Sequence, residues 1–142
     1  MSLESELCEY LDDQGILTFD ESGTSGDTFV GVLPDNPDEA NAIYSEGGPT
    51  PSPKFIEDER DIQFICRGTM DPRNALSTAN DIYSELQGAS KFVLTTDGIY
   101  VIMINGVQSG PIHIGRDDKG RHKYSLNLRV EYENTTEHRT ER

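Results

Sequence analysis

Apolar residues at the start of the chain recur at helical spacing, with acidic side chains between them. The apolar positions are Leu3, Leu7, Tyr10 and Leu11. Residues three and four positions apart share one face of an α-helix, so this segment is predicted to be an amphipathic helix. Ser2 is a suitable N-cap for that helix, and Gly15 is a suitable stop.

A second helical pattern occupies the middle of the chain. Asp71 and Pro72 are typical of a helix N-terminus, and Gly88 is typical of the position after a helix end. The apolar stripe between them is made of Ala75, Leu76, Ala79, Ile82, Tyr83 and Leu86. The small alanines in this stripe predict that the helix packs closely on a sheet.

Two longer segments alternate between apolar and polar residues, which is typical of strands with one buried face. In the segment from Arg60 to Arg67, one face carries Ile62, Phe64 and Cys66, and Ile65 interrupts the polar face. In the last such segment, the apolar face is made of Tyr124, Leu126, Leu128, Val130 and Tyr132. Both segments are predicted to be strands.

Shorter apolar runs predict further strands, separated by turns rich in Gly, Pro, Asp and Ser. In the first half these strands are Ile16 to Phe19, Thr28 to Leu33 and Asn41 to Tyr44, with a mobile polar turn at Asp20 to Gly26. In the second half they are Phe92 to Thr95, Ile99 to Ile104 and Ile112 to Gly115. Hairpin signals lie at Asp97-Gly98 and Asn105-Gly106, and a third turn lies at Asp117 to Gly120.

The order of these elements predicts an α+β fold. Two helices are expected to pack on a mostly antiparallel, twisted β-sheet that ends in a C-terminal strand meander. A length of 142 residues suits a single domain. We place this domain at residues 1–132, and we expect the polar segment from Glu133 to Arg142 to be a flexible C-terminal arm.

The charge balance narrows the classes of function. The chain has 26 acidic and 12 basic residues and a net charge of −14, which disfavours binding to the phosphates of DNA. The acids are spread along the chain and only four basic residues are Lys, a composition typical of proteins from salt-loving archaea. At molar ionic strength the Debye length falls to about 3 Å, so the self-repulsion of such a chain is screened. The alternative is an ordinary acidic protein.

Membrane, export and disulfide signals are missing from the sequence. No apolar run approaches the roughly 20 residues of a membrane span, and the N-terminus lacks the basic and apolar parts of a secretory signal. Cys8 and Cys66 are too few for a disulfide framework. Both are predicted to be buried free thiols, and no contact with a membrane is expected.

Residues with catalytic or metal-binding potential do not form a recognisable site. His113 and His122 flank Asp117-Asp118, but their spacing fits no metal-ligand pattern, so a solvated hairpin tip is the preferred interpretation. The glycines from Gly106 to Gly115 lead into a strand and not into the helix that a phosphate-binding loop requires. No catalytic residue, metal ion or cofactor is therefore predicted.

The stretch from Phe29 to Gly48 is the most distinctive part of the sequence. A short apolar strand ends at Pro34, a turn with Pro and Asp follows, and a second apolar run stops at Gly47-Gly48. The amphipathic helix precedes this stretch, and the Ile62 to Gly68 strand, the second helix and the Gly110 to Leu128 segments follow it. In this order and at this length, the chain resembles the small tail-completion proteins of tailed viruses, also described as tail terminator or minor capsid proteins.

The resemblance implies a structural virion protein and not an enzyme. Members of the family are implied to form a ring, usually of six subunits, that caps the tail tube and stops its polymerisation. The implied partners are further copies of the chain, the major tail tube protein and a neck or head-tail connector protein, all at the junction of tail and neck. Genomic DNA would pass through the ring without specific binding, which an acidic lumen would favour.

A closed ring needs two different, complementary surfaces on every subunit. The best candidates are segments whose contacts cannot all be made within one small domain. They are the turn Pro34 to Asp38, the proline-rich loop Gly47 to Pro53, and the C-terminal arm. The candidate residues for contacts with another subunit, the tube or the neck are Pro34, Asp35, Asn36, Pro37, Asp38, Gly47, Gly48, Pro49, Pro51, Pro53, Arg139 and Arg142.

Two other classes of function stay open at this point. The first is a neck adaptor or stopper, or a subunit of the tube. A tube protein polymerises without limit whereas a terminator forms closed rings, so the assembly made by the purified chain distinguishes them. The second is a cellular ligand-binding or enzymatic α+β domain, which needs a set of converging polar residues that the sequence does not offer.

Overall fold

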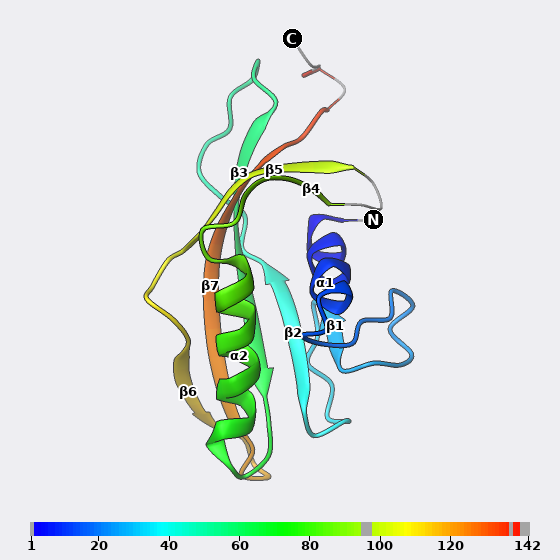
Figure 1. The fold of residues 1–142 in the computed structure, drawn as a ribbon, viewed down its shortest axis with the longest axis vertical. Coiled ribbons are helices and arrows are strands. Elements are labelled where there is room, and N and C mark those ends of the chain that lie inside the picture. Colours follow the sequence, from blue (N-terminus) through cyan, green and yellow to red (C-terminus); the bar gives the residue numbers. More distant parts are fainter. Residues whose placement is uncertain (1, 95–97, 137, 140–142) are drawn as a thin grey trace.

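The computed structural model describes residues 2–94, 98–136, 138 and 139, and it contains two helices and a seven-stranded sheet (Figure 1). The elements in chain order are α1 (Leu3–Asp13), β1 (Thr28–Val30), β2 (Ala40–Ser45), β3 (Glu57–Arg67), α2 (Pro72–Leu86), β4 (Ser90–Leu94), β5 (Ile99–Gly106), β6 (Ile112–Arg116) and β7 (His122–Glu133). The predicted α+β fold class is confirmed.

The sheet has the strand order β1-β2-β3-β7-β5-β4, and β6 pairs with β7 beside β5. The β1–β2 pair is parallel, and the other pairs are antiparallel. The long strands β3 and β7 run along the length of the molecule (Figure 1). They form the axis on which the remaining elements are placed.

The predicted hairpin at Asn105-Gly106 is wrong. β5 and β6 do not pair with each other, because both lie along the same edge of β7. β5 pairs with residues 128–132 of β7, and β6 pairs with residues 122–125. The twelve residues of β7 are long enough for two successive partners, and this arrangement replaces a simple meander among the last strands.

The predicted strand from Ile16 to Phe19 is also wrong, since only two isolated bridges form there, from Phe19 to Gly26 and to Thr28. Side chains take the backbone donors that a strand would use. The Asp12 carboxylate accepts from the Phe19 amide at 2.9 Å, and the Asp27 carboxylate accepts from the Thr18 amide at 2.9 Å. The predicted strand that starts at Thr28 is shorter than expected and ends at Val30.

Both helices begin and end where the sequence predicts. The Ser2 hydroxyl accepts from the Ser5 amide at 3.1 Å, and Gly15 adopts a positive φ of 78° after the last turn of α1. The Asp71 carboxylate caps α2 by accepting from the Arg73 amide, and Gly88 follows with φ of 80°. These local signals act within one or two turns, so they need no help from the rest of the fold.

Both helices cover one face of the sheet, and the core lies between them and the sheet (Figure 1). The buried side chains of α2 are Ala75, Ala79, Ile82 and Leu86, which confirms most of the predicted stripe. They pack with the apolar faces of β3 and β7, which include Ile62, Phe64, Cys66, Leu126, Leu128 and Val130. The Tyr10 hydroxyl donates to Glu85 at 2.8 Å and so joins the two helices directly.

Candidate assembly surfaces

The turn Pro34 to Asp38 is held by Arg121, which lies just before β7. The Arg121 side chain is only 7% exposed, and its Nη2 donates to Asp35 Oδ1 at 2.7 Å. Its Nη1 donates to the Asp35 carbonyl at 2.7 Å and to Asp38 Oδ1 at 3.1 Å. Its Nε donates to Asp117 Oδ2 at 2.7 Å. One buried guanidinium group therefore ties this turn to the β6–β7 turn.

A second arginine holds the same turn from the other side. Arg67, the last residue of β3, is 5% exposed. Its Nη2 donates to the Pro37 carbonyl at 2.7 Å, and its Nε donates to the Asp38 carbonyl at 3.0 Å. Hydrogen bonds from charged donors are stronger than neutral ones, and these two acceptors do not titrate. The turn is thus fixed in shape while its own side chains from Asp35 to Asp38 stay exposed.

The loop Gly47 to Pro53 lies beside the segment that follows β7. Arg139 is 8% exposed and donates from Nη1 to the Phe55 carbonyl at 2.7 Å. Both Nη atoms also donate to the Asp58 carboxylate, at 2.9 and 2.8 Å. Within the loop, Gly48 allows close backbone contact, since a Cβ there would lie 2.0 Å from the Glu59 carbonyl oxygen.

The described part of the C-terminal arm follows β3 and does not extend away from the domain. The Asn134 amide donates to the Ile56 carbonyl at 2.6 Å, and its side chain donates to Asp58 at 2.9 Å. Thr136 and Arg139 form an isolated bridge. The flexibility of the arm stays a prediction, and Arg142 lies outside the described residues.

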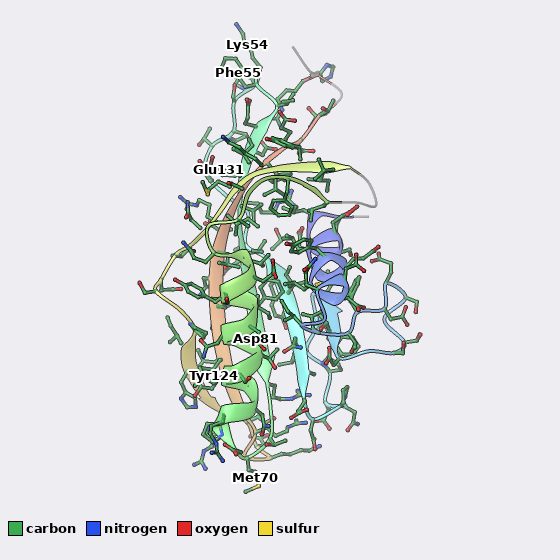
Figure 2. The ribbon with its side chains drawn as sticks, in the orientation of Figure 1. Lys54, Phe55, Met70, Asp81, Tyr124 and Glu131 are labelled. Atoms are coloured by element: carbon green, nitrogen blue, oxygen red, sulfur yellow. The ribbon has the colours of Figure 1, made fainter. Side chains whose placement is uncertain are left out.

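The candidate residues therefore gather at two opposite ends of the molecule. Lys54 and Phe55, next to the proline-rich loop, lie at one end of the long axis, and Met70 lies at the other (Figure 2). Met70 and Thr69 line a hollow of about 420 Å³ together with Asp38 and Arg121. The turn and the loop thus belong to different ends, and no contact joins them among the described residues.

The arginines also set the charge state of their partners. Hydrogen bonds from Lys119 and then Arg121 hold the pKa of the Asp35 carboxyl below its ordinary value. The hydrogen bonds from Arg139 lower the pKa of Asp58 in the same way. Both carboxylates consequently stay ionised to a lower pH than an ordinary Asp side chain.

The sequence missed these arginines because their partners are distant along the chain. The sequence predicts a solvated hairpin tip between His113 and His122, but Arg121 in this tip is buried. The tip does bring two histidines together, with His113 Nε2 and His122 Nδ1 2.9 Å apart. The sequence does contain a signal, because Arg116 and Arg121 flank the turn Asp117 to Gly120 in a chain with only twelve basic residues. This signal does not identify the residues that Arg121 binds.

No constellation for chemistry occurs among the described residues. They contain no group of three or more His, Cys, Asp or Glu side chains placed to hold a metal ion. Cys8 and Cys66 are buried free thiols, as predicted, and burial raises the pKa of Cys66 to about 12. Such thiols are poor nucleophiles at neutral pH. Within the part that the structure describes, no helix has the length and apolar character to cross a bilayer.

The domain is elongated, buried arginines hold an exposed segment at each of its ends, and its two thiols are buried. These features fit a structural protein that works through its surfaces. Residues 10–134 match the bacteriophage tail terminator protein family, and the chain belongs to that family. The chain is therefore a structural protein of the virion that terminates the tail, and not an enzyme. No curated protein matches the chain by sequence.

One of the similar solved structures is a chain in the virion of a native gene transfer agent particle. It superposes with a TM-score of 0.63 over 94% of this chain and 96% of that one, at 12% sequence identity. At this identity the likeness shows a shared fold, which spans nearly the whole length of both chains.

Proposed function

We propose that the chain forms a closed ring, built from six subunits, at the end of the tail tube. Membership of the tail terminator family supports this proposal. The observation that carries it is the placement of the candidate segments: the turn Pro34 to Asp38 and the loop Gly47 to Pro53 lie at opposite ends of the long axis. Two different ends suit a part that joins the tail tube to a neck or head-tail connector protein.

We assign one end to the tube and the other to the neck. The candidate residues that face outward in the turn are Asp35, Asn36, Pro37 and Asp38, and those in the loop are Gly47, Gly48, Pro49, Pro51 and Pro53. Arg139 serves the second end indirectly, because it positions the loop and is itself buried. Genomic DNA passes through the opening without specific binding, since a net charge of −14 opposes contact with phosphates.

The experiment is electron microscopy of the purified chain and of particles made with altered versions. We expect the purified chain to form closed rings, whereas unlimited tubes would favour a tube subunit. Particles without this chain should have unjoined or over-long tails, while capsids fill normally. Normal virions after outright deletion of the gene would remove the proposal.

A truncation after Tyr132 tests the arm separately. It removes Asn134 and Arg139, so the loop loses the hydrogen bonds that hold Phe55 and Asp58. We expect tails that fail to join at the end where the loop lies. The matched control is Arg73→Met, which changes an exposed ion pair at the other end. Normal virions with the truncated chain would reject only the role given to the arm.

We further propose that the host is a salt-loving archaeon, on the basis of the 26 acidic residues against four lysines. If so, the fold depends on salt, because the repulsion among the acids is screened only at high ionic strength. Circular dichroism should show a clearly higher Tm in about 3 M than in about 0.1 M KCl. Equal Tm values in the two solutions would reject this origin.

A further inference from the structure

The basic residues of this chain are confined to one part of the sequence, whereas the acidic residues are spread along it. Residues 1–53 contain twelve acidic side chains and no Lys, Arg or His, so all twelve basic residues lie in the remaining part. The first part forms α1, β1 and β2, which lie together at one side of the sheet (Figure 1). The fold therefore places the segment without basic residues at one side of the molecule, so the side at β1 is acidic.

The opposite side of the sheet is formed by β6. It carries exposed apolar side chains and two basic residues, Arg116 and Lys123, which share a hollow with Asp35, Asp117 and Asp118. Among the described strands, β6 pairs only with β7, so its outer edge is open. Three apolar side chains are exposed there: Val107 at 56%, Ile112 at 43% and Ile114 at 43%. Arg116 and Lys123 lie at the end of the same strand pair, and neither forms an ion pair with a described residue. We call these five residues the β6 edge.

The β1 side has a matching surface. Val30 is 42% exposed and Val32 is 53% exposed. They line a hollow of about 340 Å³ with Phe29 and with the acidic residues Asp20 and Glu21. Neither acid forms an ion pair with a described residue, and Asp20 binds hydroxyl groups of its own turn instead. We call these five residues the β1 edge.

Exposed apolar side chains are concentrated on these two edges. Of the eight large apolar residues that are exposed among those described, five belong to the β6 edge or the β1 edge. Apolar patches rimmed by charged residues are typical of protein–protein interfaces. The charged residues of the β1 hollow are acids alone, whereas Arg116 and Lys123 are present at the β6 edge, which favours contact between the two edges and disfavours contact of the β1 edge with itself.

The two edges also lie at the same level of the sheet. The pairing registers place Phe29, Ala42, Ile65, Ser125 and Ile112 on one continuous row across five strands. If the sheet of one copy meets the sheet of the next edge to edge, the contact requires little displacement along the strands. A contact between unlike surfaces closes into a ring only when it adds no net translation, and otherwise gives a helical filament.

We propose that the β6 edge of one copy docks on the β1 edge of a second copy of this chain, so that these edges are the subunit interface of the ring. This inference rests on the proposed ring, and it adds the surfaces that build it. The isoleucines of β6 pack into the hollow beside Val30 and Val32, and Arg116 and Lys123 face the acidic side of the neighbour. The turn and loop at the two ends are left free for the tube and the neck.

The test uses two variants, each with one blocked edge. The first is Ile112→Asp with Ile114→Asp, and the second is Val30→Asp with Val32→Asp. All four side chains are more than 40% exposed, so the substitutions leave the core intact. Met70→Asp is the control, because Met70 is 75% exposed and lies at the end of the long axis.

Light scattering coupled to size-exclusion chromatography measures the mass of each assembly, and circular dichroism confirms folding. We expect each blocked variant to be monomeric, and the Met70→Asp variant to assemble like the unaltered chain. An equimolar mixture of the two blocked variants has one working pair of edges, so its mass should double to a one-to-one dimer and grow no further.

Other outcomes overturn the inference in distinguishable ways. If either blocked variant still forms the ring, or if the two folded variants do not dimerise when mixed, the edges are not the interface, and the proposed ring stands. If the unaltered chain itself forms no closed assembly, the inference is overturned together with the ring of the proposed function.

Discussion

The two ends of the molecule both carry a proline-containing segment, but these segments are held in different ways. The turn Pro34 to Asp38 is tied by Arg67 and Arg121, which lie at the ends of the long central strands. The loop Gly47 to Pro53 is tied by Arg139, which lies beyond the last strand. The rigidity of a turn therefore depends on where its arginine is anchored, and not only on its own prolines.

This difference in how the two segments are held suits the two ends to different kinds of partner. A turn whose shape is fixed before contact loses little conformational entropy on binding, so it suits a rigid partner of repeating structure. The loop, in contrast, is held by an arginine outside the sheet strands. Three changes test this comparison, and they follow in order of decreasing expected effect.

The largest effect is expected from Arg121→Met. The change removes the three hydrogen bonds that hold the turn and a fourth to Asp117, and it leaves three carboxylates without their shared cation. We expect the Tm to fall by roughly 5–10 °C. Hydrogen exchange should quicken at residues 34–38 and stay unchanged at residues 47–53.

The control for this change is Arg73→Met, since Arg73 pairs with Asp71 while 87% of its side chain is exposed. Exposed pairs contribute little, so its Tm should stay close to that of the unaltered chain. Equal protection of residues 34–38 in the Arg121→Met variant would contradict the role of Arg121 in holding the turn.

A smaller effect is expected from Gly48→Ala in the loop. The added Cβ would lie 2.0 Å from the Glu59 carbonyl oxygen, so the loop must move away from β3. Because the loop can shift, we expect a loss of about 1–3 kcal/mol in the free energy of unfolding, measured with urea. Thr50→Ala, an exposed change in the same loop, should be neutral. A neutral Gly48→Ala variant would show that the loop does not approach Glu59.

The smallest effect is expected from Asp58→Asn, and it concerns the stability of the fold at acidic pH. Hydrogen bonds from Arg139 lower the pKa of Asp58 in the folded chain. The stabilisation from this contact is therefore present above the unfolded pKa of about 3.9 and is lost as the pH falls through the lower, folded value. Asp58→Asn should reduce stability at neutral pH and flatten the loss of stability below about pH 4. Equal acid unfolding curves for the two chains would contradict the assigned contact.

Local signals in the sequence determined much of the fold. Ser2 and Asp71 cap the helices, and the alternation of Ile62, Phe64 and Cys66 identifies the buried face of β3. These features depend on neighbours a few residues away, so the pattern of the chain is enough to predict them. The family resemblance carried by residues 29–48 is of the same kind, because it follows from the order of local elements.

Contacts between distant residues were decided only by the tertiary structure. Arg121 lies 86 positions from Asp35, and Arg139 lies 81 positions from Asp58, so no local pattern pairs them. The turn signal at Asn105-Gly106 predicts that β6 pairs with β5, but β7 is long enough to hold both strands on one edge. The sequence alone shows that residues 1–53 contain no basic side chain, but the sheet order is what places that segment opposite β6, because strand pairing brings together residues that the chain keeps far apart.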